Sequence, residues 1–289
     1  MITPTVSPPE DILLPAAPSE HVRRLFTWWT ARMIRRSFSA VRIAAGTAAA
    51  LRALDAGAAP LIVAMNHQTW WDPLLGIHLA AALTPSRRML APMEMAQLRK
   101  FAIFRRLGVF GLAPDDPRAL AAMRAYLARE FARGPAKSLW ITPQGEFVDV
   151  RTPVRIRPGV AAVAAATRGA GLVCIALEIT HWLDRRPEVL IRIARVAPPQ
   201  GDATIAAWTR TLTTAMRANA AALALLVQSR DPAAFEIITS GRAARVNPLY
   251  DAWLWVRGKP RTLDATPRPS RAARRLRAAD EKPAAQVRA

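Results

Sequence analysis

The feature that limits the fold most is an alternation, between residues 61 and 196, of short apolar runs with segments of helical pattern. The apolar runs predict strands at residues 61–65, 88–91, 109–113, 138–142, 172–179 and 189–196. The segments between and after them predict helices at residues 72–82, 93–107, 117–133, 159–168, 203–227 and 231–239. Strands and helices that alternate at this spacing indicate an α/β fold with a mostly parallel central sheet flanked by helices.

The 289-residue chain divides by composition into four parts. With 52% hydrophobic residues it can bury a sizeable core, and its length suits one α/β domain with extensions or at most two small domains. Residues 56–257 hold the alternating elements and form the main domain. Proline-rich residues 1–19 predict a flexible lead-in, residues 20–55 predict amphipathic helices, and arginine-rich residues 258–289 predict a disordered basic tail.

The second of these parts begins with an amphipathic pattern. Its apolar residues recur at helical spacing, with arginines mainly between them: Val22, Leu25, Phe26, Trp29 and Met33. Two interpretations stay open. The helix can lie at a membrane interface, with aromatic rings at the lipid headgroups and arginines on lipid phosphates, or it can pack on the core.

The charge balance is strongly basic, with 41 Lys+Arg against 21 Asp+Glu and a formal net charge of +20. Such a field attracts polyanions, either nucleic acid or an anionic lipid surface, although a general bias toward alanine, arginine and proline accounts for part of the excess. The basic residues concentrate toward the two ends, without a helix-turn-helix, zinc or ribonucleoprotein signature. We therefore expect an anionic membrane surface, and no specific nucleic acid, as partner.

The sequence favours a peripheral location on the cytoplasmic face of a membrane. No uninterrupted apolar run approaches the roughly 20 residues that a spanning helix needs. The N-terminus lacks the basic region and apolar core of a secretory signal. A single cysteine, Cys174, excludes an intramolecular disulfide, and its place in an apolar run predicts an inert buried thiol.

The stretch with the most chemical information is residues 66–73, directly after the apolar run 61–65. His67 follows the carboxyl end of the expected strand, which is where ligands bind in open α/β sheets. Asp72 comes five positions later. In one continuous helix the two side chains would point about 140° apart, but across a turn between strand and helix they can converge.

Such a pair has a defined chemistry. An aspartate that accepts the proton of one imidazole nitrogen fixes the tautomer and leaves the other nitrogen free to take a proton from a hydroxyl. Two structural interpretations compete with this one. A lone histidine after a strand can be purely structural, and Asp72 before Pro73 can cap the following helix, with proline at its first position.

Four blocks of sequence, in order, resemble those of the glycerolipid acyltransferase family, typified by the lysophosphatidic acid acyltransferases. The first family signature is Asn-His-x-x-x-x-Asp, which Asn66, His67 and Asp72 fill in register. The further matches are residues 107–111 (second block), 140–146 (third block, usually Phe-Pro-Glu-Gly), 157–159 (Lys/Arg-x-Gly) and 171–177 (apolar fourth block). The resemblance runs from about residue 60 to residue 196 and identifies residues 56–257 as an acyltransferase domain.

The resemblance implies an O-acyltransferase. It would move a fatty acyl group from acyl-CoA or acyl carrier protein, as co-substrate, to a hydroxyl of a lipid acceptor, with no further cofactor and no metal. His67 would act as general base and Asp72 would orient the imidazole, while a backbone N–H near the third block would stabilise the oxyanion. The residues expected in substrate binding are Asn66, Pro143, Gln144, Gly145, Glu146, Arg151 and Arg157.

The chain departs from the family in two blocks. The second block normally continues with an Asp-Arg pair, where this chain has Ala113 and Pro114. The third normally has Glu before the glycine and Arg shortly after it, where this chain has Gln144 and Phe147, and Glu146 adds a negative charge. A planar arginine fork binds phosphate better than a generic cation does. We therefore expect an acceptor other than lysophosphatidate or glycerol 3-phosphate.

Several alternatives stay open. Arg151, Arg155 and Arg157 can replace the missing anion contacts, or they can be solvated surface residues. The acceptor can present an uncharged hydroxyl, as a glycolipid or a glycosylated isoprenoid does. The chain can also be a basic nucleic-acid-binding protein or a catalytically decayed membrane scaffold, although retention of both His67 and Asp72 argues against decay.

The other histidines and the tryptophans of the motif carry weaker signals. His78 lies in the helix expected after the motif and suggests packing or surface, and His181 follows the fourth block. Trp70 and Trp71 either shape an acyl channel or pack behind the motif. The four histidines have no ligand spacing, so no metal site is expected.

Overall fold

The computed structural model describes residues 11–134, 136–241, 253 and 256–258. Over these ranges one sheet holds nine strands in the order β1-β5-β4-β6-β3-β7-β8-β2-β9. The strands are β1 (Leu13–Leu14), β2 (Ala40–Ala44), β3 (Leu61–Met65), β4 (Arg88–Glu94), β5 (Val109–Leu112), β6 (Lys137–Ile141), β7 (Gly171–Thr180), β8 (Glu188–Arg195) and β9 (Phe235–Ser240). The pairs β4–β5, β4–β6, β3–β6, β3–β7 and β2–β8 are parallel, which confirms the expected mostly parallel sheet.

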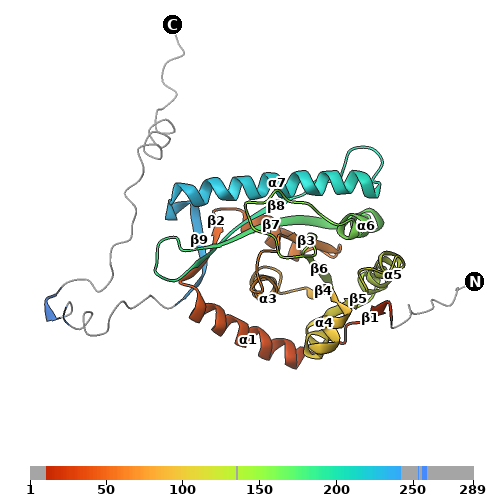
Figure 1. The fold of residues 1–289 in the computed structure, drawn as a ribbon, viewed down its shortest axis with the longest axis horizontal. Helices are drawn as coiled ribbons and strands as arrows, with labels where there is room; N and C mark the ends of the chain where they lie inside the picture. Colours follow the sequence, from red (N-terminus) through yellow and green to blue (C-terminus); the bar gives the residue numbers. More distant parts are fainter. Residues whose placement is uncertain (1–10, 135, 242–252, 254–255, 259–289) are drawn as a thin grey trace, which may run out of the picture.

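Helices flank the sheet, with α7 along one side of the molecule and α1 along the opposite side (Figure 1). The helices are α1 (Glu20–Ser37), α2 (Ala48–Asp55), α3 (Asp72–Leu83), α4 (Met95–Lys100), α5 (Ala119–Ala132), α6 (Gly159–Ala166) and α7 (Ile205–Ser229), with the 3-10 helices η1 (Ala102–Leu107) and η2 (Pro232–Ala234). Because helices cover both faces, the central strands can be apolar at every position.

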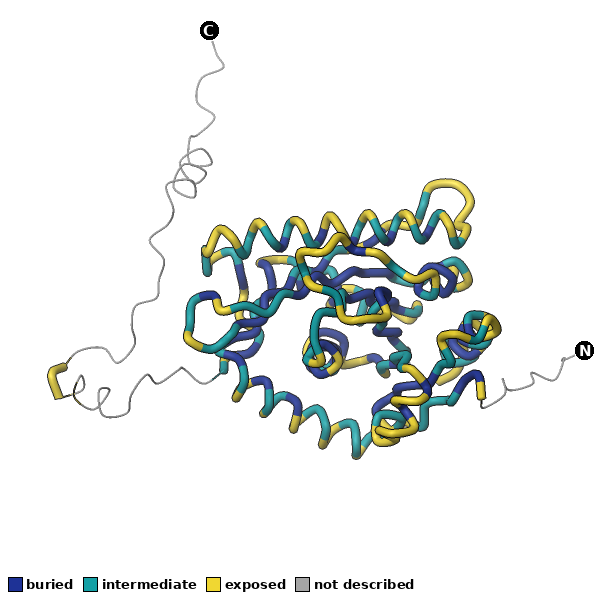
Figure 2. The backbone as a smooth tube through the Cα atoms, in the orientation of Figure 1, coloured by how far each residue is buried: buried dark blue, intermediate teal, exposed yellow. Residues whose placement is uncertain are grey.

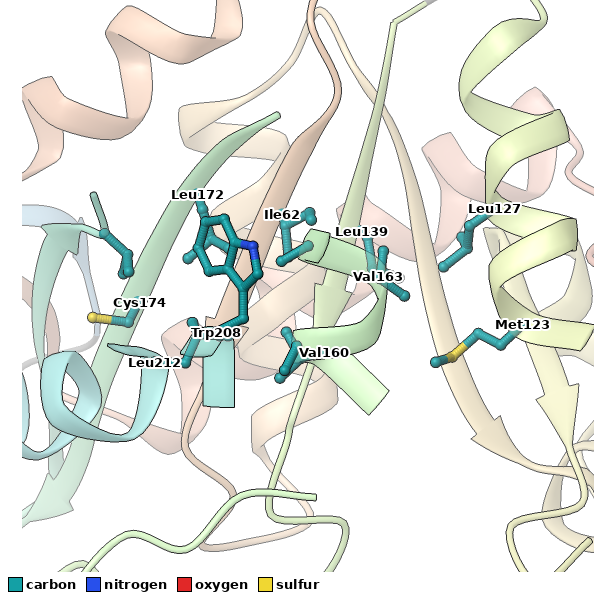
Figure 3. Packing of buried hydrophobic residues seen from close by; sticks show 14 of the residues in the cluster. Ile62, Met123, Leu127, Leu139, Val160, Val163, Leu172, Cys174, Trp208 and Leu212 are labelled. Carbon is teal, nitrogen blue, oxygen red and sulfur yellow. The ribbon is translucent and has the colours of Figure 1, made fainter. Parts of the chain in front are cut away.

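Alternate side chains of β3 enter the two cores on either side of the sheet. Ile62 and Ala64 pack in a cluster with residues of α5, α6 and α7, part of which Figure 3 shows. Leu61, Val63 and Met65 pack in a second cluster with residues of α1, α2 and α3. A shift of one residue would exchange the two sets, so burial on both sides fixes the register of the strand. The motif that follows β3 therefore starts at a defined point on the carboxyl edge of the sheet.

A strand occupies part of the range 20–55, which the sequence predicted to be helical. β2 pairs in parallel with β8 and antiparallel with β9, and its Val41 and Ile43 are fully buried. Arg42, between them, forms a largely buried ion pair with Glu188 of β8. The helical prediction is wrong for this strand, because partners far away in the sequence decide its conformation.

Two other predicted helices differ from the structure. The range 231–239 forms η2 and then β9, whose residues Ile237, Ile238 and Thr239 favour a strand and which pairs with β2 at the edge of the sheet. The helix predicted at residues 93–107 is interrupted at Phe101 and forms α4 and η1 instead. The other predicted helices and strands begin and end within a few residues of their expected bounds.

Residues 11–19 pack against the sheet, although their composition predicted a flexible lead-in. β1 pairs with β5, and Ile12 and Leu13 are buried. The described part of the lead-in is therefore held by the fold. Residues 1–10, and the predicted basic tail beyond Gly258, lie outside the described residues.

Candidate active site

The motif begins with Asn66, whose side-chain amide ties the end of β3 to β7. Its Nδ2 donates to the carbonyl oxygen of Leu177 at 2.9 Å, and its Oδ1 accepts the N–H of Leu177 at 2.8 Å. Both ends of the amide are thus bound to backbone. Asn66 was expected in substrate binding, but its geometry is that of an anchor that fixes where the following loop starts.

His67 and Asp72 converge across the turn, as their spacing predicted. Nδ1 of His67 lies 2.8 Å from Oδ2 of Asp72. The Asp72 carboxylate is fully buried and accepts three more hydrogen bonds: from the Gln68 N–H at 2.6 Å, the Thr69 N–H at 2.8 Å and the Thr69 hydroxyl at 3.3 Å. Four donors around one carboxylate compensate for the water that it loses on burial.

Asp72 does not cap α3. It is the first residue of the helix, with Trp71 at the N-cap position and Pro73 in the first turn, and no side-chain capping bond forms. The carboxylate turns back to the loop and binds the N–H groups of Gln68 and Thr69. The capping interpretation is therefore wrong, and these bonds hold Asp72 behind the imidazole.

The contact with Asp72 determines which nitrogen of the neutral His67 imidazole carries the proton. When Nδ1–H donates to Asp72, Nε2 keeps a lone pair that can accept a proton. The His67 side chain is 17% exposed, and none of the described residues binds its Nε2. The imidazole can therefore meet a substrate hydroxyl from the solvent side.

The third block holds the backbone of His67 from the other side. The buried Gln144 accepts the His67 N–H through Oε1 at 2.9 Å, and the Val148 N–H donates to the His67 carbonyl oxygen at 2.7 Å. Gln144 stands where the family has glutamate, and either side chain offers an oxygen acceptor at this position. The segment after β6 thus fixes His67 at two points.

Gly145 allows this segment to turn. Its φ is +74°, in the left-handed region that favours glycine. A Cβ at this position would lie 2.8 Å from Nε and 2.9 Å from Cδ of Arg157, so the arginine lies directly across the turn. The N–H of Arg157 also donates to the carbonyl oxygen of Pro143 at 2.8 Å. The structure therefore brings Arg157, one of the expected substrate-binding residues, against the turn that holds Pro143 and Gly145.

Two exposed aromatic side chains belong to this region. The ring centroid of Phe147 lies 4.5 Å from that of His67, and Phe147 is 61% exposed. Trp70 is also exposed and stacks on Trp71 at 4.5 Å, while Trp71 contacts the buried Phe38 at 4.9 Å. Trp71 thus packs behind the motif, whereas Trp70 stays open to solvent.

The arginines expected to bind an anion have different surroundings. Arg151 donates two hydrogen bonds to the Asp149 carboxylate, at 2.8 and 2.7 Å, and these bonds lower the pKa of Asp149 to about 2. Arg155 and Glu146 are exposed. Arg157 lies across the glycine turn and has no acidic partner among the described residues. Of the three arginines, Arg157 is therefore the best placed to meet an anionic group near the histidine.

Two residues beside the motif, Thr69 and Glu178, carried no sequence prediction. Thr69 binds Asp72 through its N–H and its hydroxyl, which a threonine three residues before an aspartate in a turn could have indicated. Glu178, on β7 next to the Leu177 that anchors Asn66, is half-buried, and burial raises the pKa of its carboxyl. No local signal marks Glu178, because its place depends on how β7 pairs with β3.

Other ionisable groups have structural surroundings. His78 is buried on α3 with Nε2 2.7 Å from the Thr239 hydroxyl, and burial, followed by the charge of Arg35, lowers the pKa of its imidazole. Burial raises the pKa of the Cys174 thiol to about 11, as for an inert buried cysteine. In the described part of the chain, no three His, Cys, Asp or Glu side chains are grouped so that they could hold a metal ion. None of the helices described is both long and apolar enough to span a membrane.

A partly exposed imidazole, oriented by a buried carboxylate at the carboxyl edge of an α/β sheet, is suited to take a proton from a hydroxyl. Residues 39–178 match the family model described as Acyltransferase, and this range contains the motif, the third block and most of β7. Over this range the chain is therefore similar to acyltransferases, in agreement with the resemblance of its sequence blocks to the glycerolipid acyltransferases.

No curated protein matches the chain. Among solved structures, it is similar to the 1-acyl-sn-glycerophosphate (LPA) acyltransferase PlsC from Thermotoga maritima. The two sequences are 18% identical, and the match covers 69% of this chain and 79% of that chain with a TM-score of 0.47.

Proposed function

We propose that this protein transfers a fatty acyl group from an acyl thioester to a hydroxyl of a lipid, with His67 as the general base. The observation that carries the proposal is the bond between Nδ1 of His67 and the buried Asp72, which leaves Nε2 free to accept a proton. The acyltransferase family match over residues 39–178 supports the reaction class.

The reaction needs one base that later acts as an acid. Nε2 of His67 takes the proton of the acceptor hydroxyl while the hydroxyl oxygen attacks the thioester carbonyl carbon. Asp72 stabilises the imidazolium that forms. When the tetrahedral intermediate collapses, the carbon–sulfur bond breaks and the imidazolium returns its proton to the leaving thiolate. The products are an ester and a free thiol.

The turn of the third block supports an oxyanion site. The Gly145 N–H donates to the carbonyl oxygen of Thr142, and the Val148 N–H donates to that of His67. Between them, the N–H groups of Glu146 and Phe147 have no partner among the described residues. Backbone N–H groups with free donors near the base can stabilise the developing negative charge.

The donor we propose is acyl-CoA or acyl carrier protein, both of which carry a phosphate at the end of the pantetheine arm opposite the thioester. Arg157 supports this choice, because it is exposed and lies across the turn that holds His67. An arginine without an acidic partner can bind such an anion by charge-assisted hydrogen bonds.

The acceptor we propose presents an uncharged hydroxyl, as a glycolipid or a glycosylated isoprenoid does. Phe147, at the place where the family tends to have arginine, puts an aromatic ring against His67, and Arg151 is already paired with Asp149. A phosphate beside Phe147 would therefore lack the arginine fork that the family tends to offer there, and Arg157, which has no acidic partner among the described residues, is the arginine that we assign to the donor. An aromatic face suits the apolar side of a sugar ring or a lipid chain.

We further propose that the protein works at the cytoplasmic face of a membrane as a peripheral protein. Decay of the site into a scaffold is the alternative that the hydrogen bonds argue against, because every polar atom of Asp72 is still engaged around His67. A site without selection for activity has no need of a buried carboxylate, which costs free energy unless its donors are kept.

The direct test incubates purified protein with labelled acyl-CoA, or with labelled acyl carrier protein, and a total lipid extract, and then identifies the labelled product by mass spectrometry. We expect a labelled ester, and a loss of about 10²–10⁴-fold in rate for His67→Ala with an unchanged thermal midpoint. Lysophosphatidate, a matched monoacylglycerol and a glycosylated lipid should then be compared as acceptors. Normal turnover by His67→Ala would contradict the mechanism, and a clear preference for lysophosphatidate would contradict the acceptor.

A further inference from the structure

α1 directs its largest apolar side chains outward. Thr30 and Ile34 are buried on the inner face of the helix, whereas Leu25 is 67% and Trp28 61% exposed, and Trp29 is also exposed. Figure 2 shows exposed and half-buried residues along the outer side of this helix, on the side of the molecule opposite α7. A helix that packs only on the core would place these residues inward, so the outer face offers an apolar surface to a further partner.

The segment of α4 and η1 continues this outer face. Phe101, between the two helices, and Ile103 are exposed. The ring of Phe26 on α1 lies 6.0 Å from that of Phe104 on η1 in an edge-to-face contact. Backbone bonds also join η1 to the residues just before α1, since the N–H groups of residues 17 and 19 donate to the carbonyl oxygens of residues 105 and 106 at 3.0 and 2.9 Å. α1 and η1 therefore form one continuous surface.

Positive charge surrounds this surface. α1 contains five arginines and a single acidic residue, Glu20, which is paired with Arg23 and Arg24. The three arginines in the second half of α1 are exposed and have no acidic partner among the described residues. Residues 95–107 add four basic residues and no acidic one. The surface is thus complementary to a layer of negative charge.

We propose that Leu25, Trp28, Trp29, Phe101 and Ile103 form one docking surface for an anionic lipid bilayer. Tryptophan rings at the headgroup level and arginines on lipid phosphates are the groups that hold a protein in the plane of a membrane interface. This inference deepens the peripheral location proposed above, and it does not depend on the reaction that the site performs.

The docking surface leads to the motif. α1 runs along α3: Thr27 and Ala81, near the far end of α3, line one small cavity, and Phe38, directly after α1, contacts Trp71 beside the start of α3. The exposed Trp70 stacks on Trp71 at this end. A bilayer along α1 would therefore lie close to the end of α3 that carries Trp70 and the motif.

The structure changes which residues are expected to touch lipid. β2 lies within the range 20–55, for which a membrane-interfacial position was one of two open interpretations, but it is a core strand and cannot contact a bilayer. η1 lies outside that range and belongs to the docking surface. The participation of η1 therefore distinguishes this surface from a simple N-terminal amphipathic anchor.

The first experiment measures binding of the full chain to vesicles of phosphatidylglycerol and phosphatidylethanolamine, with phosphatidylcholine vesicles for comparison. Two double variants are used, Trp28→Ser with Trp29→Ser and Phe101→Ser with Ile103→Ser. The control is Leu225→Ser on α7, which is 69% exposed on the other side of the molecule. We expect each double variant to weaken binding by about tenfold or more, because two apolar side chains lose their burial in lipid, and the control to bind as the parent does.

A second experiment reports insertion directly. Trp28→Cys and, as control, Leu225→Cys are labelled with an environment-sensitive fluorophore; the native Cys174 is buried and its raised thiol pKa keeps it unreactive. The label at position 28 should shift to the blue when anionic vesicles are added, and the label at position 225 should not.

Three outcomes would overturn the proposal. Normal binding by the Phe101/Ile103 variant would remove η1 from the surface. Salt-sensitive binding without a blue shift at position 28 would reduce the contact to adsorption by charge alone. Equal binding by the Leu225→Ser control and both double variants would show that the surface has no role. None of these measurements involves turnover, so a failure here leaves acyl transfer to a short-chain soluble acceptor as a separate measurement of the proposed function.

Discussion

The two segments that meet at His67 are built differently. The loop after β3, residues 66–72, commits its polar side chains to internal bonds: Asn66 binds the backbone of β7, and Asp72 accepts four hydrogen bonds. The segment after β6, residues 143–157, buries only Gln144 of its polar side chains and leaves its arginines at the surface.

This difference explains why the chain keeps the first block and can depart from the family at the exposed Phe147. Removal of one partner from a buried hydrogen-bond network leaves the others unsatisfied and costs about 1–3 kcal/mol for each group. Exposed side chains can change with an effect on stability within about 0.5 kcal/mol. The first segment is therefore constrained by both folding and chemistry, whereas the second can exchange an arginine for Phe147 and alter what the site recognises.

Replacement of an aspartate by asparagine in each segment should give the largest difference between the two segments. Asp72→Asn should lower kcat by about 10²-fold or more, because the amide cannot support the imidazolium, and should also lower the thermal midpoint because four donors lose a charged acceptor. Asp149→Asn, which breaks an exposed pair with Arg151, should change neither quantity. Steady-state kinetics well below both midpoints separates activity from unfolding, and equal losses in the two variants would remove the proposed contrast.

The sequence predicted the first segment well because local rules decide it. Because β3 is apolar and buried on both faces, its register with β6 and β7 is fixed, and so is the point at which the motif begins. The five-residue separation of His67 from Asp72 then lets a short turn bring the two side chains together. The same local rules predicted the bounds of β6, β7 and most of the helices to within a few residues.

The parts that the sequence did not predict depend on distant partners. β2 becomes a strand because β8 and β9 pair with it, and its Arg42 is tolerated because Glu188, 146 residues away, neutralises it. The contact of Phe147 with His67 likewise depends on the path of a turn set by Gly145 and Arg157. No periodicity in the sequence encodes such contacts.

Among the described residues, one hydrogen bond joins the two segments through a side chain, and its loss should have an intermediate effect. Gln144→Leu removes the acceptor for the His67 N–H and should lower kcat by about tenfold, with little change in KM, because the imidazole is held less firmly. Gln144→Glu keeps an oxygen acceptor and should retain most of the activity. If both variants lose activity equally, the side-chain oxygen is not what positions His67.

A substitution in the exposed segment, residues 143–157, should change the selectivity for the acceptor rather than the rate. Phe147→Arg restores a cation beside His67, so the ratio of kcat/KM for lysophosphatidate to that for monoacylglycerol should rise by about tenfold, the value of one charge-assisted bond after discount for exposure. Phe147→Leu removes the ring without adding charge and should leave the ratio unchanged. A rise in both variants would mean that Phe147 obstructs phosphate by its size and that charge has no part.

The smallest expected effect tests whether the buried polar contacts of the first segment, residues 66–72, continue into α3. His78 lies on this helix, and burial together with Arg35 lowers its pKa from the usual 6.5, so the folded state favours the neutral imidazole. As the pH falls below about 6.5, the unfolded chain then binds more protons than the folded one. The free energy of unfolding therefore decreases as the pH falls, until the pH has passed the pKa of His78 in the folded state. His78→Gln cannot gain this proton, so its urea midpoint between about pH 7 and pH 5 should vary less than that of the parent. Parallel slopes for the two proteins would show that His78 is not the group responsible, and that the acid sensitivity of the fold arises away from the helix that Asp72 begins.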